Sequence, residues 1–389
     1  MLIKNAKIYT MEQGVIENGY IITRGSIIHD IGPMETMPQG DFGYMIDGNG
    51  KVIMPGLVDG HSHLGMWEDG IGFEGADGNE DTDPITPHLS ALDSINPLDP
   101  AFSESLSAGV TTAIVGPGSA NVLGGQLIAI KTDGMCIDDM IIKNPVSAKA
   151  AFGENPKTTY HEKNQTPVTR MAAVALLREN LQKAQQYRQD LKKHNEHPDD
   201  NDKPEYNNKL EALLPVLNRQ IPLQAHAHRA DDICSALRIA KEFDINLILV
   251  HCTEGHLVLS KIKQSGFPVM LGPALNDRSK PELKNLTLHT AVEMQCAGID
   301  VAIISDHPET PAKFLLLCAM LHIKDGLDAE TALSAITITP ACMCGIADRV
   351  GSLKKGKDAD FIILDGEPLD FYSKIKTVIV NGRICYEGI

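Results

Sequence analysis

The chain has 389 residues, of which 43% are hydrophobic and 22% charged, so it is neither a disordered nor a fibrous protein. This length suffices for one large domain with a smaller one beside it. The formal net charge of −16 disfavours binding to nucleic acid or to an anionic membrane, although a few local arginines could still bind a small anionic substrate.

The sequence predicts a cytoplasmic protein. It has no apolar run of about 18 residues or more, so we expect no membrane-spanning helix. The first eight residues, MLIKNAKI, lack the apolar core of a signal peptide and instead indicate a strand. The eight cysteines are scattered, and a chain of this size does not need disulfides, so we expect reduced thiols.

Both ends of the chain are rich in short strands. Residues 21–28 (IITRGSII) have a strand–turn–strand pattern. Residues 377–380 (TVIV) precede Asn381 and Gly382, a strong hairpin signal. Two β-rich ends around a different middle predict one small β domain built from both termini.

Between these ends, apolar runs such as residues 112–115 and 301–304 alternate with helical stretches such as 170–187. This alternation is typical of parallel βα units, and continuous apolar strands suit a sheet that is buried on both faces. An eight-stranded TIM (β/α)8 barrel needs about 250 residues, which the middle of the chain supplies. The predicted domains are an α/β TIM barrel at 54–349 and a β-sandwich formed from 1–53 and 350–389.

The first candidate for chemistry is the pair His61 and His63, which follows an apolar run. Alternate residues of a strand point the same way, so both imidazoles share one face. Two imidazoles on one face suit a transition metal, although a His-x-His sequence also arises by chance.

Three further polar residues stand where other predicted strands end, namely His226, His251 and Asp306. In a barrel, these positions meet at the carboxyl ends of the strands, where catalytic groups collect. One such residue could be a solvated strand end, but their joint occurrence favours a shared metal site.

With these residues in place, the sequence resembles the amidohydrolase superfamily of metal-dependent hydrolases over nearly its whole length. Residues 56–63 (GLVDGHSH) are similar to the first-strand motif of that superfamily, and residues 351–360 (GSLKKGKDAD) to the stretch that re-enters its β-sandwich. The chain looks closest to imidazolonepropionase-like and dipeptidase-like members, whose small substrates carry a carboxylate. The resemblance also implies a homo-oligomer.

The resemblance implies a role for each candidate. His61 and His63 would be first-strand metal ligands, with His226 and His251 as the ligands on the fifth and sixth strands. Asp306 would bind metal, accept a proton from the attacking water and pass it to the leaving nitrogen. His228 points the same way as His226 on an extended chain, and could contact substrate or metal instead.

The fourth strand leaves two alternatives. Many superfamily members carry a carboxylated lysine there, which bridges two metals. We prefer Glu154 as a direct ligand, as in the N-acetylglucosamine-6-phosphate deacetylase branch, although it could simply be a carboxylate at a helix start. Lys149, five residues earlier, is the alternative. One or two ions are possible, and zinc is expected, although iron, nickel and manganese also suit imidazole and carboxylate ligands.

The expected reaction is hydrolysis of an amide, cyclic amide or peptide C–N bond in a small, carboxylate-bearing molecule. A bound divalent ion lowers the pKa of its water to about 7 and polarises a carbonyl group. Arg229 could bind the substrate carboxylate, and Tyr160 and Arg170 could reach the site. A deaminase of the same superfamily and a non-catalytic scaffold are the alternatives.

Overall fold

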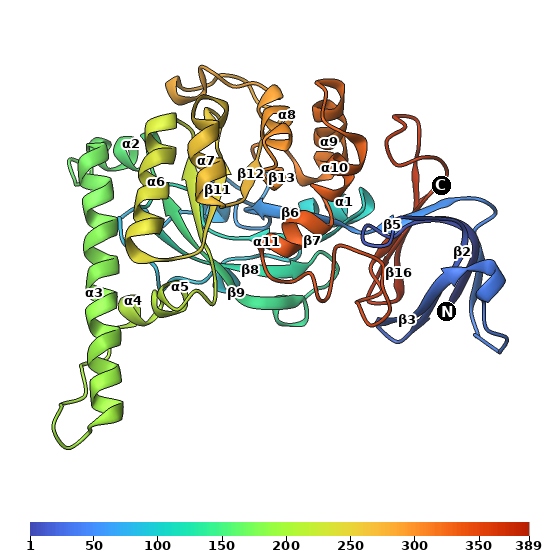
Figure 1. Cartoon of the computed structure of the whole chain (residues 1–389), viewed down its shortest axis with the longest axis horizontal. Coiled ribbons are helices and arrows are strands. Elements are labelled where there is room, and N and C mark those ends of the chain that lie inside the picture. Colours follow the sequence, from blue (N-terminus) through green and yellow to red (C-terminus); the bar gives the residue numbers. More distant parts are fainter. Residues whose placement is uncertain (389) are drawn as a thin grey trace.

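The computed structural model describes residues 1–388, which form two β-sheets with helices packed around one of them (Figure 1). The terminal segments lie together in a β-rich part, and both chain ends are found there. The middle of the chain forms a nearly closed eight-stranded barrel sheet. This mixed α/β architecture confirms the predicted fold class.

The terminal sheet follows the order β16-β15-β14-β5-β1-β2-β3, with β4 paired to β1. Its strands are β1 (Leu2–Tyr9), β2 (Val15–Arg24), β3 (Ile27–Pro33), β4 (Met45–Asp47), β5 (Val52–Pro55), β14 (Phe361–Leu364), β15 (Ile375–Val380) and β16 (Arg383–Glu387). The predicted hairpin at Asn381 and Gly382 is confirmed, because β15 and β16 pair antiparallel with Val380 opposite Arg383. Isoleucines of both termini share one buried cluster.

The barrel sheet runs in chain order from β6 to β13, and β13 contacts β6. Its strands are β6 (Leu57–Ser62), β7 (Val110–Val115), β8 (Leu123–Lys131), β9 (Ile141–Ala151), β10 (Leu223–Ala227), β11 (Leu247–His251), β12 (Val269–Leu271) and β13 (Val301–Ile303). Only Gly56 separates β5 from β6. A Cβ atom there would lie 2.0 Å from Thr111 Oγ1, so no other residue fits this passage between the two sheets.

One barrel strand departs from the parallel pattern, since β8 is antiparallel to both β7 and β9. The reason is the length of the connections, at residues 116–122 and 132–140. A parallel crossover needs about a dozen residues or more, so connections this short permit only hairpins. The reversed strand brings residues 116–122 to the end of the barrel where β6 and β7 finish.

The α-helices are α1 (Pro100–Ser107), α2 (Glu154–Glu162), α3 (Arg170–Glu196), α4 (Asn208–Glu211), α5 (Leu214–Leu217), α6 (Ala230–Phe243), α7 (Leu259–Ser265), α8 (His289–Cys296), α9 (Leu315–Lys324), α10 (Ala329–Ser334) and α11 (Ile338–Met343). The 3₁₀ helices are η1 (Met34–Thr36), η2 (Gly72–Gly75), η3 (Ala91–Asp93), η4 (Ile137–Asp139), η5 (Gly255–Val258), η6 (Pro281–Leu283) and η7 (Ala312–Phe314). Among residues 1–388, no helix combines the length and the apolar character needed to cross a membrane.

The longest helix, α3, stands at the end of the molecule opposite the terminal sheet (Figure 1). The Thr169 hydroxyl caps its first turn by accepting the N–H of Ala172 at 3.0 Å. A buried stripe at helical spacing then packs it against the core, formed by Ala173, Leu177, Leu181 and Ala184. The helix continues to Glu196, nine residues beyond the end of the helical stretch predicted at 170–187.

Candidate metal centre

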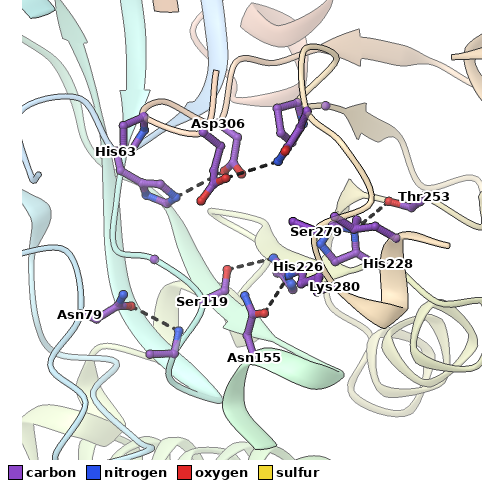
Figure 2. A pocket seen from close by; sticks show the side chains of 18 of the residues that line it. His63, Asn79, Ser119, Asn155, His226, His228, Thr253, Ser279, Lys280 and Asp306 are labelled. Atoms are coloured by element: carbon purple, nitrogen blue, oxygen red, sulfur yellow. Dashed lines mark hydrogen bonds and ion pairs between the residues drawn. The ribbon is translucent and has the colours of Figure 1, made fainter. Parts of the chain in front are cut away.

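The predicted ligands gather at one end of the barrel because each stands at or just beyond the carboxyl end of a strand. His61 is on β6 with His63 just after it, His226 is on β10, His251 ends β11 and Asp306 follows β13. All five are buried. Figure 2 shows His63 and Asp306 on one side of the cavity and His226 on the other.

The backbone at two of these residues has an uncommon conformation. His251 has φ of 69° and Asp306 has φ of 56°, in the left-handed region that residues other than glycine rarely adopt. Such conformations persist only where the surrounding structure fixes them, and they cluster at functional sites. The strand ends are therefore shaped to direct these side chains.

The side chains form two groups in which the potential ligand atoms lie within 4.8 Å of one another. The first group contains His61, His63 and Asp306, and the second contains His226, His228 and His251. Nitrogen and carboxylate donors in groups of three are a ligand set for Zn²⁺ and related divalent ions. His228 was predicted to contact substrate or metal, and the structure places it among the potential ligands and in the lining of the cavity.

Three imidazoles are fixed through Nδ1 by oxygen atoms that can only accept a hydrogen bond. Nδ1 must therefore carry the proton, and Nε2 is left with a lone pair that can bind metal. The pairs are His61 with Gln224 Oε1 at 2.7 Å, His63 with Gly116 O at 2.6 Å, and His251 with Gly272 O at 2.7 Å.

The other two imidazoles are fixed by hydroxyl groups. His226 Nδ1 lies 2.9 Å from Ser119 Oγ, and His228 Nδ1 lies 2.7 Å from Thr253 Oγ1, as seen in Figure 2. His226 Nε2 is fully buried and has no hydrogen-bond partner among the described residues. Such an atom carries a desolvation cost unless a ligand binds it, so the residues present fit a metal ion.

Burial affects the protonation of the site. It lowers the pKa of His251 to about 4 and holds the pKa of His61 and of His226 well below the usual value, so these imidazoles stay neutral. Burial alone would raise the pKa of Asp306, but the nearby rings of His251 and His63 bring it well below its usual range. Neutral imidazoles and an ionised carboxylate are the forms that bind metal.

Asp306 connects the cavity to the first group. Its Oδ1 lies 3.4 Å from His63 Nε2 and 3.7 Å from His61 Nε2. The backbone N–H of Asp306 also donates to the carbonyl of His61 at 3.2 Å, which ties the end of the last barrel strand to the first.

Lys149 lies on β9 inside the barrel and is fully buried. Its Nζ donates to His61 Nε2 at 2.8 Å. Its charge also lowers the pKa of His226 and His251, so it lies near both groups of ligands. Burial lowers the pKa of Lys149 to about 8, so a substantial fraction of the amine is neutral at slightly alkaline pH.

Glu154, the preferred fourth-strand ligand, lies outside both groups. It is the first residue of α2, and its Oε2 accepts the N–H of Glu282 at 3.3 Å. The preference for Glu154 does not agree with this geometry, because β9 ends at Ala151 and the chain has turned out of the barrel by residue 154. Lys149, still within the strand, is the residue that reaches the ligands.

The three other predicted substrate contacts do not line the cavity that holds the ligands. Tyr160 is buried and donates to Asn121 Oδ1 at 2.6 Å. Arg170 pairs with Asp232 at 2.9 Å, and Arg229 pairs with Asp231 at 2.9 Å. Arg229 thus forms an ion pair with an acid two residues away in the chain. The partners of Tyr160 and Arg170 come from distant positions in the chain.

The cavity above the two groups has a volume of about 640 Å³, which suits a small molecule. Its lining includes Lys280, and no other lysine or arginine among the described residues lines it. Sequence reasoning missed this residue and its neighbour Glu282, which lie in the irregular segment after β12. Neither ends an apolar strand, so no signal in the sequence marked them.

Comparison with known proteins agrees with this geometry. Residues 185–385 match the sequence profile of the amidohydrolase family. Amidohydrolase tasK of Hapsidospora irregularis is 29% identical over 399 residues, which cover 94% of this chain and 40% of that protein. An imidazolonepropionase of Maricaulis maris is 28% identical over 171 residues, which cover 42% of this chain and 40% of that protein. These matches span less than half the length of either relative.

A solved structure matches this chain along its whole length. The crystal structure of an amidohydrolase from Thermotoga maritima MSB8 is 38% identical, covers 100% of both chains and has a TM-score of 0.94. The resemblance predicted from residues 56–63 and 351–360 is confirmed. The chain belongs to the amidohydrolase family.

Proposed function

We propose that this chain hydrolyses a C–N bond of a small substrate with the help of one or two divalent metal ions. The observation that carries the proposal is the position of Asp306, which lines the cavity and faces the Nε2 atoms of His61 and His63 at 3.7 and 3.4 Å. A carboxylate held between a substrate cavity and metal-type ligands is placed to move a proton during hydrolysis.

Zinc is the proposed metal, since imidazole and carboxylate donors suit it, although iron, nickel and manganese suit them too. His61, His63 and Asp306 would hold one ion, and His226, His228 and His251 a second. When bound, such an ion supplies Lewis acidity, which lowers the pKa of a bound water and polarises the substrate carbonyl.

The chain's own residues supply the rest of the chemistry. Asp306 accepts a proton from the attacking water at its carboxylate and returns it to the departing nitrogen. The five anchored imidazoles keep their orientation because their Nδ1 atoms are already bonded. The lining of the cavity is mixed in polarity, and Lys280 is the cation best placed to meet the carboxylate of a substrate.

Lys149 is the proposed link between the two halves of the site. A neutral lysine amine can react with carbon dioxide to give a carbamate, and the carbamate would supply oxygen ligands to both ions. The depressed pKa of Lys149 and its contact with His61 support this role. Glu154 is assigned no metal contact in this arrangement.

The experiment is a screen of the purified protein with N-acyl amino acids, dipeptides, cyclic amides and imidazolonepropionate. The last compound is included because of the match to an imidazolonepropionase. Turnover should require divalent metal and should be lost in the Asp306→Asn variant. The screen also includes 5-methylthioadenosine, because of the match to a 5-methylthioadenosine/S-adenosylhomocysteine deaminase, and release of ammonia from its amino group would identify a deaminase.

A metal-loaded protein that turns over none of these compounds would favour the non-catalytic scaffold. A cytoplasmic location and a homo-oligomeric state remain predictions. Size-exclusion chromatography with light scattering would test the second.

A further inference from the structure

Glu282 is a buried carboxylate beside the second group of ligands. It lies in η6 after β12 and is 1% exposed. Its Oε1 is 3.8 Å from His226 Nε2 and 3.7 Å from His228 Nε2. One oxygen therefore faces two imidazole nitrogens, and sequence reasoning assigned it no function.

These separations are too long for hydrogen bonds. A carboxylate that accepts a ring N–H lies about 2.7–2.9 Å from the nitrogen. Two ligands bound to one zinc ion at about 2.1 Å, at tetrahedral to trigonal angles, lie about 3.4–3.6 Å apart. The observed distances are much closer to the second pattern, and His226 Nε2 has no hydrogen-bond partner among the described residues.

The other carboxylate oxygen holds Glu282 in this orientation. Oε2 accepts the N–H of Glu154 at 3.0 Å, at the start of α2. Gly153 makes this approach possible, since it has φ of 87° and a Cβ atom there would lie 2.9 Å from Oε2. The backbone of residues 153 and 154, just after β9, thus orients Glu282. The side chain of Glu154 is not grouped with the imidazoles.

Lys280 is the alternative partner of Glu282. Its Nζ lies 2.8 Å from Oε1 of Glu282 and 2.8 Å from Asn155 Oδ1. Figure 2 shows Lys280 beside His226 and His228, so the ammonium and a metal ion would compete for the same oxygen. If the ion pair were the whole role of Glu282, removing either partner would have the same consequence.

We infer that Glu282 is a direct carboxylate ligand of a divalent cation bound by His226 and His228. The inference rests on the proposed function, because it assigns a further donor to the second of the two ions. It also predicts that Lys280 is released from the carboxylate when that ion binds, which makes its ammonium available to an anionic substrate.

The test compares zinc binding to wild-type protein and the variants Glu282→Gln, Lys280→Met and Glu309→Gln by equilibrium dialysis and elemental analysis. Glu309 is an exposed carboxylate that lines the same cavity, so its variant controls for the loss of one negative charge. We expect Glu282→Gln to weaken the affinity for the second zinc ion by a factor of at least about 10. Lys280→Met and Glu309→Gln should keep the wild-type affinity.

Cobalt(II) gives a second readout, because its visible spectrum reports the ligand set directly. The spectrum should change in Glu282→Gln and stay the same in Lys280→Met. If Glu282→Gln does not fold because Lys280 has lost its partner, the double variant Glu282→Gln/Lys280→Met removes both charges and should show the same loss of zinc.

Each other outcome overturns the inference. Equal zinc binding in wild type and Glu282→Gln, or equal losses in Glu282→Gln and Lys280→Met, would reduce Glu282 to a salt-bridge residue and leave the proposed function intact. Wild-type protein that binds no divalent metal would overturn the proposed function together with the inference.

Discussion

The ammonium of Lys149 and the imidazole of His61 meet inside the barrel, with 2.8 Å between Nζ and Nε2. Both side chains are completely buried, and they come from the fourth and first strands of the barrel sheet. As an ammonium, Lys149 fills the position beside His61 Nε2 that a metal ion would take. Once carboxylated, it would instead help to bind a metal ion.

The first prediction separates Lys149 from Glu154 as the fourth-strand ligand. Replacing Lys149 with Met should lower the metal content from about two ions per chain to one or none, because the link between the two groups is lost. Glu154→Gln should keep the wild-type content. Elemental analysis after dialysis with zinc, in the presence and absence of bicarbonate, measures both variants. Loss of metal in Glu154→Gln alone would restore Glu154 as the ligand.

The second prediction concerns the proton transfer by Asp306. Asp306→Asn should lower kcat by about 10²–10⁴-fold because the amide cannot accept the proton of the attacking water. The amide oxygen can still act as a ligand, so most of the metal should remain. Steady-state kinetics on the first substrate found, together with metal analysis, tests both parts. Undiminished turnover would defeat the proposed mechanism.

The third prediction concerns Ser119, whose Oγ lies 2.9 Å from His226 Nδ1. Ser119→Ala removes the group that orients this imidazole, and should weaken zinc binding about 10–100-fold. Ser103→Ala is the matched control, since the exposed Ser103 hydroxyl bonds only to the carbonyl of Pro100 in its own helix. Competition with a fluorescent zinc chelator gives both affinities, and equal values would show that Ser119 has no role in positioning His226.

The fourth prediction concerns the terminal sheet. Glu12 accepts hydrogen bonds from Lys357 and Ser352, which lower its pKa to about 2. A lowered pKa means that the contact stabilises the fold fully above pH 4.5 and is lost as the pH falls towards 2. Because Glu12 is partly exposed, we expect Glu12→Gln to lower the free energy of unfolding by only about 1 kcal/mol at pH 7.

Urea unfolding at pH 7 and pH 3 measures this difference. The gap between wild type and Glu12→Gln should shrink at the lower pH, because at pH 3 the unfolded chain, in which Glu12 has its ordinary pKa of 4.5, binds a proton that the folded chain largely does not. A gap that stays constant, or one that grows as the pH falls, would contradict the linkage.

The sequence was sufficient to identify the potential metal ligands that end barrel strands. An apolar run followed by His226, His251 or Asp306 marks the place where a buried strand reaches the cavity, and this rule needs only local information. The rule failed for the fourth barrel strand, because the pattern of apolar residues does not show where β9 ends. A shift of a few residues in that end decides whether Lys149 or Glu154 faces the barrel interior.

Other features depend on contacts that no local pattern encodes. The orientation of β8 follows from the length of its connections, but recognising it requires the strand ends to be known. Arg229 suited both a substrate carboxylate and an ion pair with a nearby acid until its contact with Asp231 was located. Glu282 lies in a segment without regular hydrophobic spacing, and only the folded chain brings it to His226 and His228.

The pairing of β5 with β14 places Pro55 opposite Phe361 in the sheet. The ribosome therefore makes one partner about 300 residues before the other. Until β14 emerges, one edge of β5 has no strand to pair with, and the apolar side chains of the nascent β1 and β5 lack part of their cover. The pairing of β5, the strand that leads into β6 and His61, is thus completed only near the end of synthesis, so an unpaired apolar strand edge is open to aggregation for most of that time.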